Sequence, residues 1–419
     1  MSVSKFHYMA GILAVPRDDL DAAHTRVGGE EVPVDEVLES TESPDTDDES
    51  FRRARGAIDS TFGFLRHDDP PVAVEALTLD GIESSVIHIV GFATHWAAYP
   101  ATRPDPVAVE DLEGVPPTGT DQFVAVIDTG VVSGGPTWFA GGISPLSDFG
   151  DTTIATVGAS HGTFIAGLIR RLACNHRVSM AKLRMVDNHK VASPKGMPPL
   201  IDVSTEIHLY EAVSRLTDRD EPYQALNLSV GTYTQNDLSS WIMRKALDLW
   251  FERFPEGAVF AAGGNEYEKG STPYSPLWPA ALGRDTGFAH HDRLFGVGAV
   301  DRNGVDVVWD YHPSSGFTSV ETLSSGASLR PWIKVRAPGT DLISFGDFDA
   351  GGSPQFVKWS GSSFATPVAL ATYLNEGISP PLDSKHDEVE GLTHDVDGSL
   401  RQTHWEHGSP CAPVAVSAG

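Results

Sequence analysis

The chain has 419 residues, 40% of them hydrophobic, which is enough for one large domain or for two to three ordinary domains with real cores. The formal net charge of −27 repels nucleic acid and anionic membranes and argues against both as partners. The only cysteines, Cys174 and Cys411, are too few for a disulfide-built secreted domain, so we expect two free thiols.

The N-terminus carries one short apolar run, which ends at Val15 before Pro16. The run is at the lower length limit for a signal peptide and no Ala-x-Ala cleavage site ends it, so we expect a strand here. No run in the chain reaches the roughly 20 apolar residues that a membrane helix needs. We therefore expect a cytoplasmic protein, with secretion as the alternative.

The first 115 residues predict a small α+β unit. The expected elements are strands at 6–15, 72–79 and 85–92, a short helix at 17–26, an acidic loop at 28–50 and an amphipathic helix at 51–65. We expect Phe51, Ile58 and Phe62 to pack this unit against the domain that follows. Prolines and glycines between residues 101 and 119 mark a linker into that domain.

A buried parallel strand is predicted at 123–127, because the run is continuously apolar and rich in β-branched residues. Asp128 follows at its carboxyl end, where an open α/β sheet places its functional groups. His161 lies 33 residues further on (161 − 128) and opens a predicted helix that runs to residue 172. Taken alone, Asp128 could be merely a helix or turn cap, and His161 merely a cap.

More strands and helices are predicted beyond this point. The strands are expected at 178–186, 225–231, 258–262 and 294–300, and the helices at 206–215 and 237–254.

The last predicted helix begins within Gly361-Ser362-Ser363-Phe364-Ala365-Thr366-Pro367. A serine at a helix N-terminus has its backbone N–H pointing outward, so it can be a nucleophile and also help to hold an oxyanion. An isolated Gly-Ser-Ser turn is more often a loop and an N-cap. Asp128, His161 and this serine, however, occur in an order that a Ser-His-Asp hydrolase triad adopts.

Three stretches resemble the signature blocks of the subtilisin-like serine proteases, the subtilases. They are Val124-Ala125-Val126-Ile127-Asp128-Thr129-Gly130, His161-Gly162-Thr163-Phe164-Ile165-Ala166-Gly167 and the segment around Ser363. The resemblance covers about residues 119 to 375. It implies an α/β fold with a mostly parallel β-sheet flanked by helices on both faces, preceded here by a small N-terminal α+β extension.

The resemblance implies a triad of Asp128, His161 and Ser363. Ser362 stands where the family carries threonine, and the register of the Phe-Ala-Thr-Pro that follows makes Ser363 the nucleophile. The stretch Ala261-Ala262-Gly263-Gly264-Asn265 resembles the family's Ala-Ala-Gly-Asn block, which makes Asn265 the oxyanion donor.

The resemblance also implies where an extended peptide substrate binds. The residues expected to line it are Ser229, Val230, Gly231, Ala262, Gly263 and Gly264. Tyr274 is expected to narrow the specificity pocket.

Neither a cofactor nor a metal is expected. Many subtilases wrap Ca²⁺ in a longer loop after the histidine helix, but here residues 173–177 alone connect that helix to the next strand and provide too few oxygen donors. His404 and His407 lie in a polar tail with few further ligands, so we expect no metal site there.

The sequence thus predicts an N-terminal extension at 1–115, a catalytic domain at 116–376 and a polar tail at 377–419. Residues 309–329 depart from the family pattern and receive no assignment. The extension is either a prodomain or an attached accessory domain, and we expect it to stay attached. The function expected is that of a serine endopeptidase working through an acyl-enzyme, for general turnover or for maturation or regulation of one peptide. The alternative is an inactive pseudoprotease that binds peptides.

Overall fold

A computed structural model of the chain describes most of the extension and most of residues 116–376, the predicted catalytic domain. The described residues are 6–41, 49–91, 105–106, 122–132, 134–145, 157–193, 203–267, 275–301, 304–312, 316–322, 330–348 and 354–376.

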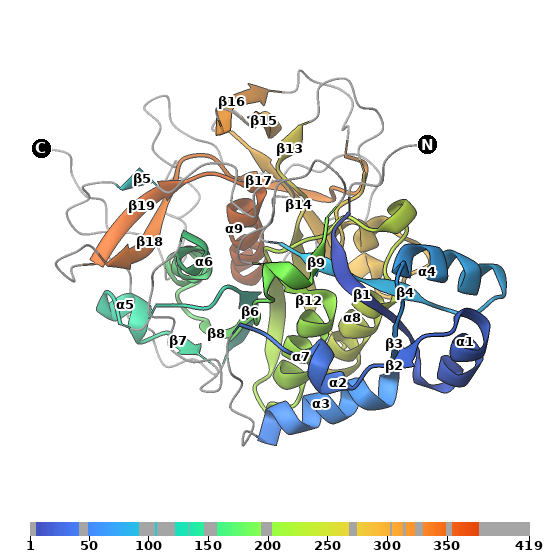
Figure 1. Cartoon of the computed structure of the whole chain (residues 1–419). Helices are drawn as coiled ribbons and strands as arrows, with labels where there is room; N and C mark the ends of the chain where they lie inside the picture. Colours follow the sequence, from blue (N-terminus) through green and yellow to red (C-terminus); the bar gives the residue numbers. More distant parts are fainter. Residues whose placement is uncertain are drawn as a thin grey trace, which may run out of the picture.

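The centre of the catalytic domain is a seven-stranded sheet whose neighbouring strands are all parallel (Figure 1). Its strands in spatial order are β17 (Val335–Pro338), β14 (Leu294–Val300), β12 (Ala258–Ala262), β11 (Tyr223–Leu228), β6 (Phe123–Asp128), β8 (Arg177–Lys182) and β7 (Ile143–Pro145). Strand β12, inside the sheet, is buried along its whole length. The apolar runs therefore predicted parallel strands correctly.

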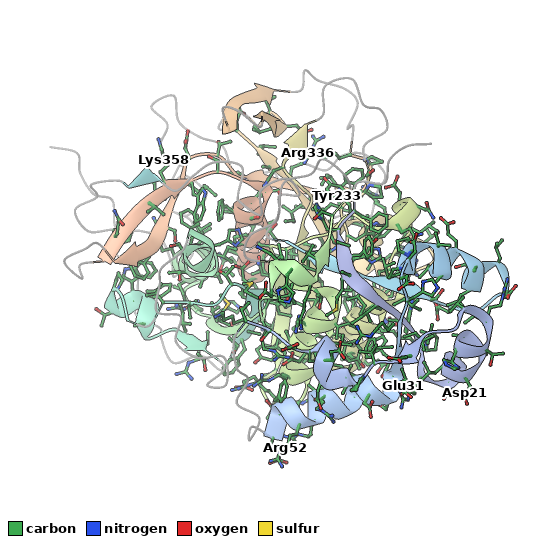
Figure 2. All side chains as sticks on the ribbon, viewed as in Figure 1. Asp21, Glu31, Arg52, Tyr233, Arg336 and Lys358 are labelled. Atoms are coloured by element: carbon green, nitrogen blue, oxygen red, sulfur yellow. The ribbon has the colours of Figure 1, made fainter. Side chains whose placement is uncertain are left out.

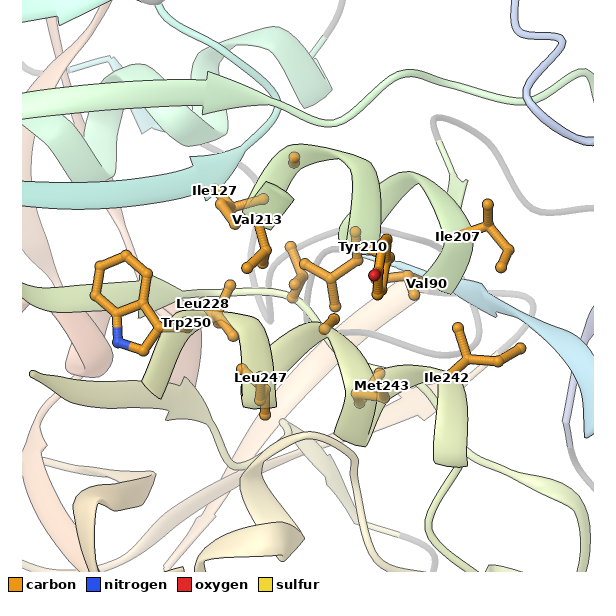
Figure 3. Packing of buried hydrophobic residues seen from close by; sticks show 14 of the residues in the cluster. Val90, Ile127, Ile207, Tyr210, Val213, Leu228, Ile242, Met243, Leu247 and Trp250 are labelled. Atoms are coloured by element: carbon orange, nitrogen blue, oxygen red, sulfur yellow. The ribbon is translucent and has the colours of Figure 1, made fainter. Parts of the chain in front are cut away.

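Helices cover both faces of this sheet (Figure 1). They are α5 (Thr137–Ala140), α6 (Val157–Leu172), α7 (Glu206–Thr217), α8 (Trp241–Arg253) and α9 (Ser362–Glu376). Val124 and Val126 of β6 pack with α6 and α9, whereas Ala125 and Ile127 belong to a second hydrophobic cluster with α7 and α8. Figure 3 shows Ile127 beside Val213 of α7 in the second cluster. The predicted fold class is confirmed.

The strands of the extension lie in a second, antiparallel sheet, distinct from the seven-stranded sheet. Its strands are β10 (Ser204–Thr205), β4 (Ser85–Val90), β1 (Tyr8–Pro16), β3 (Phe62–Arg66) and β2 (Glu30–Glu31), and β9 (Val191–Ala192) pairs with β1 as well. Its helices are α1 (Leu20–Val27), α2 (Val34–Val37), α3 (Glu49–Thr61) and α4 (Pro70–Leu79). Since β9 and β10 come from the catalytic part of the chain, the two parts share one sheet.

The strand expected at 72–79 is wrong, because these residues belong to α4. The Asp69 carboxylate accepts a hydrogen bond from the Val72 N–H at 3.4 Å, and Pro70 occupies the first turn. A capping aspartate followed by proline is a strong start signal for a helix. It outweighs the β-branched side chains of Val72 and Val74, which favoured a strand.

Two boundaries inside the extension also differ from expectation. The helix expected at 51–65 ends at Thr61, and the chain continues as β3, whose first four residues are buried. The acidic segment at 28–50 is not one loop, because β2 and α2 lie within it. Pairing with β1 accounts for the change at β3, since β1 offers partners from Ile12 to Pro16.

The extension packs on α7 and α8 as expected. Phe51, Ile58 and Phe62 are buried in the same hydrophobic cluster as residues of both helices. The Phe62 ring centroid lies 4.9 Å from that of Tyr210 on α7. Arg52, on the opposite side of α3, is exposed and projects outward (Figure 2). The helical spacing of the apolar residues thus places one face of α3 in the shared core.

Polar contacts join the extension to the catalytic domain as well. The backbone N–H and the ring Nδ1 of His88, on β4, both lie 3.0 Å from Glu206 Oε1 at the start of α7. Both side chains are almost fully buried. At the surface, Arg53 forms an ion pair with Asp218 at 2.8 Å. A buried carboxylate paired in this way is costly to leave unpaired.

Residues 309–329, unassigned from the sequence, contain parts of two strands. β15 (Val307–His312) and β16 (Gly316–Thr322) form an antiparallel pair, and β13 (Glu266–Tyr267) adds to β15. A further small sheet contains β18 (Leu342–Phe348), β19 (Pro354–Trp359) and β5 (Asp105–Pro106).

Two further expectations concern a cysteine and the membrane. Cys174 is bonded in a disulfide, so the expectation of free thiols is wrong for this residue, while Cys411 lies outside the described residues.

Among the described helices, none has the length and apolar character required to span a bilayer. The linker boundary near residue 115 and the polar tail at 377–419 also lie outside the described residues.

Candidate active site

Asp128 is the last residue of β6 and is fully buried at the carboxyl end of the central sheet. Its Oδ1 accepts three hydrogen bonds, from the Thr129 N–H at 2.7 Å, from the Thr129 hydroxyl at 3.1 Å and from the His161 Nδ1 at 2.8 Å. Three donors around one oxygen fix the orientation of the carboxylate.

His161 lies in the second turn of α6, which begins at Val157 and not at His161 as the sequence suggested. The next residue, Gly162, allows the helix to approach the Asp128 loop closely. A Cβ on Gly162 would lie 2.2 Å from the Gly130 carbonyl oxygen, and the Gly162 N–H donates to the Thr129 hydroxyl at 2.9 Å. Thr129 therefore links the aspartate to the histidine helix.

The two serines at the start of α9 have different hydrogen bonds. Ser362 Oγ accepts from the Gly264 N–H at 3.2 Å, and the Ser362 N–H donates to Asn265 Oδ1 at 2.6 Å. Ser363 Oγ is buried and makes no hydrogen bond within the described part of the chain. The ring of the adjacent Phe364 lies 5.2 Å from the His161 ring, centroid to centroid. Ser363 is thus the serine at the start of α9 whose hydroxyl is not already engaged, and its neighbour Phe364 packs against the histidine ring.

Asn265 follows β12 after two glycines, and its side chain is oriented by the first residue of α9. Because Oδ1 accepts from the Ser362 N–H, the Nδ2 amide group is the donor end that faces away from that bond. Gly264 has a φ of +100°, a value that glycine adopts readily. The sequence motif therefore marked a real turn, and the turn brings Asn265 to the start of α9.

The segment expected to bind substrate lies beyond the end of β11. Ser229 Oγ donates to the Ser363 carbonyl at 2.7 Å and accepts from the Asn227 amide at 3.0 Å, so its side chain braces α9. Val230 is fully buried. Gly231 exchanges both of its backbone hydrogen bonds with Gly91 of the extension, at 2.8 and 2.9 Å in antiparallel fashion. The extension thus occupies the backbone groups expected to receive a substrate.

Ala262 is the last residue of β12, and Gly263 and Gly264 follow it directly. The Gly263 N–H donates to the Val297 carbonyl at 2.8 Å. Tyr274 lies outside the described residues, and so do His404 and His407. Within the described ranges, no three histidine, cysteine or acidic residues are grouped as metal ligands would be.

Two residues outside every sequence motif also contact this site. Arg330 donates to the Gly264 carbonyl and Trp332 Nε1 donates to the Gly263 carbonyl at 3.0 Å. No motif marks either residue, and both follow the segment that matched no family pattern. Thr129 was also missed, although the Asp-Thr-Gly block contains it.

Comparisons with known proteins bear on this site. The subtilase family model, Peptidase_S8, matches residues 119–373, and no curated protein matches the chain. Similar solved structures include the prenylagaramide maturation protease PagA, with 19% identity, TM-score 0.41 and coverage of 67% of this chain and 81% of that one. A cold-adapted subtilisin-like serine proteinase has 17% identity, TM-score 0.38 and coverage of 67% and 84%. A lanthipeptide protease has 16% identity, TM-score 0.37 and coverage of 61% and 72%.

The matched segment begins just before β6 and ends within α9, so it contains every strand of the central sheet and all three predicted triad residues. It spans more than half of the chain. The chain belongs to the subtilase family and is a subtilisin-like serine endopeptidase.

Proposed function

We propose that Asp128, His161 and Ser363 are the catalytic triad of this endopeptidase. The observation that carries the proposal is the 2.8 Å hydrogen bond between His161 Nδ1 and Asp128 Oδ1. The Ser363 hydroxyl makes no hydrogen bond within the described residues. An aspartate that accepts from Nδ1 holds the tautomer in which Nε2 is a base.

Acyl transfer follows from this arrangement. His161 Nε2 takes the Ser363 Oγ proton as Oγ attacks the peptide carbonyl, and it then gives that proton to the leaving amine. Water then attacks the acyl carbonyl while His161 Nε2 takes a proton from it. His161 gives that proton to Ser363 Oγ as the acyl group is released. Asp128 keeps its hydrogen bond to Nδ1 and stabilises the imidazolium that forms.

We propose Asn265 Nδ2 and the Ser363 backbone N–H as the two oxyanion donors. Ser363 is the second residue of α9, so its N–H belongs to the helix turn whose donors have no intrahelical partner. The Ser362 N–H, by holding Asn265 Oδ1, keeps the amide from flipping. Both donors therefore need no reorganisation when negative charge develops.

The substrate we propose is an extended peptide. The backbone of Gly231 supports an extended substrate, because its N–H and carbonyl already pair with Gly91 as they would with an antiparallel strand. A substrate that uses the same groups must displace Gly91. A dedicated substrate for maturation or regulation, and a cytoplasmic location, remain part of this proposal.

Asn265→Ala tests the oxyanion assignment. We expect the initial rate of cleavage of fluorescently labelled, unfolded casein to fall about 10²- to 10³-fold, because one of two donors to the transition state is lost. Asn375→Ala, which removes an amide donor to the Leu172 carbonyl near the other end of α9, should change the rate less than about twofold. A loss below about tenfold in the Asn265 variant would contradict the assignment.

We also propose that the extension stays attached. Its removal would leave β9 without its partner β1, and would expose the surface that Phe51, Ile58 and Phe62 cover. Intact mass spectrometry of wild type and of Ser363→Ala, purified identically, is expected to give full-length masses for both. If the wild type alone lacks the extension, the segment is an autoprocessed prodomain.

A further inference from the structure

The loop that leads to Asn265 contains two consecutive glycines, Gly263 and Gly264. Glycines give the backbone great freedom, so an oxyanion donor placed directly after them needs external restraint. A side chain has no room at Gly263, because Ile333 Cδ1 lies 2.0 Å from the position that a Cβ would take. A side chain at Gly263 would displace Ile333 or the loop.

Both peptide planes before Asn265 are held by side chains. In the first plane, the Gly263 carbonyl accepts from Trp332 Nε1 at 3.0 Å and the Gly264 N–H donates to Ser362 Oγ at 3.2 Å. In the second plane, the Gly264 carbonyl accepts a short hydrogen bond from Arg330 Nη1. These bonds fix the plane whose N–H belongs to Asn265, and with it the direction of the Asn265 side chain.

The two donors come from one tight turn, residues 330–333. The Ile333 N–H donates to the Arg330 carbonyl at 3.1 Å, and the Lys334 N–H donates to the Gly296 carbonyl of β14 at 2.8 Å. Arg330, Trp332 and Ile333 are each no more than 6% exposed. A buried guanidinium at the Gly264 carbonyl also puts positive charge near the site where the oxyanion develops.

We propose that Arg330 and Trp332 are positioning residues of the oxyanion site, which hold the Gly263–Gly264 peptides so that Asn265 Nδ2 meets the developing oxyanion. This inference rests on the proposed role of Asn265. Neither residue touches the substrate in this account. Their contribution is therefore to the rate of the chemical step and not to the affinity for the ground state.

Trp332→Phe isolates the indole hydrogen bond, since phenylalanine keeps an aromatic ring in the same space. The measurement is the reaction of a fluorophosphonate probe with the full-length protein, resolved into kinact and KI. We expect kinact to fall about tenfold while KI stays within about twofold. Trp250→Phe is the matched control, because Trp250 is buried in α8 and its Nε1 makes no hydrogen bond to the described residues. Its kinact should equal that of the wild type.

The same substitution in the Asn265→Ala background decides whether Trp332 acts through Asn265. We expect Trp332→Phe to change kinact less than about twofold there, because there is no amide left to position. Arg330→Met should lower kinact as well, and Arg330→Lys should recover part of the loss by keeping a charged donor.

An equal loss from Trp332→Phe in both backgrounds, or a raised KI with unchanged kinact, would overturn the positioning role while Asn265 kept its own. If Asn265→Ala alone retains the wild-type kinact, the oxyanion assignment fails and this inference fails with it.

Discussion

Ser363→Ala is expected to abolish labelling by a fluorophosphonate and to lower peptide hydrolysis by about a millionfold. The substitution removes a hydroxyl that makes no hydrogen bond within the described residues, one residue before the Phe364 ring that packs against His161. What remains is catalysis by binding and by the oxyanion donors alone.

Ser362→Ala is the matched control, one residue away in the same helix. It removes the hydroxyl that accepts from the Gly264 N–H, so a loss within about tenfold is expected from a less well held loop. Circular dichroism spectra of both variants are expected to match that of the wild type, which separates a loss of activity from a loss of folding. Undiminished labelling of Ser363→Ala, or loss of labelling in Ser362→Ala alone, would move the nucleophile to Ser362.

Asp128→Asn is expected to lower the rate of casein hydrolysis by about 10⁴-fold at neutral pH. The amide keeps the shape of the carboxylate, but it presents an N–H that favours the wrong histidine tautomer and no longer stabilises the imidazolium. The 2.8 Å bond from His161 Nδ1 to Asp128 Oδ1 is the contact that changes.

Asp218→Asn serves as the control for this substitution. Asp218 pairs with Arg53 at the surface, where such an ion pair contributes little, and hydrolysis should stay within about twofold of wild type. If Asp128→Asn retained more than about a tenth of the wild-type rate with an unchanged melting temperature, the proposed role of Asp128 would be wrong.

The elements around the triad were predictable because local sequence determines them. Continuous apolar runs gave the parallel strands, and Asp128 stands at a strand end as those runs implied. Residues 72–79 form part of helix α4 and not a strand, because the helix start signals at Asp69 and Pro70 outweigh the β-branched residues that follow. The helix predicted at 51–65 is correct up to Thr61, where strand pairing with β1 replaces helical hydrogen bonds.

Contacts between distant segments were not predictable from local pattern. The pairing of Gly91 with Gly231 joins residues 140 positions apart (231 − 91), and neither glycine carries a signal for the other. Arg330 and Trp332 likewise reach the loop before Asn265 from a segment without a recognised motif. Tertiary packing alone brings such residues together, so a single sequence does not reveal them.

The most direct test of the account identifies the residue that a fluorophosphonate modifies. Wild-type protein is labelled, digested and sequenced by tandem mass spectrometry, with Ser363→Ala treated in parallel. One adduct is expected, on Ser363, with fragment ions that leave Ser362 unmodified, and no adduct is expected in the variant. An adduct on Ser362 or on a serine outside α9 would contradict it.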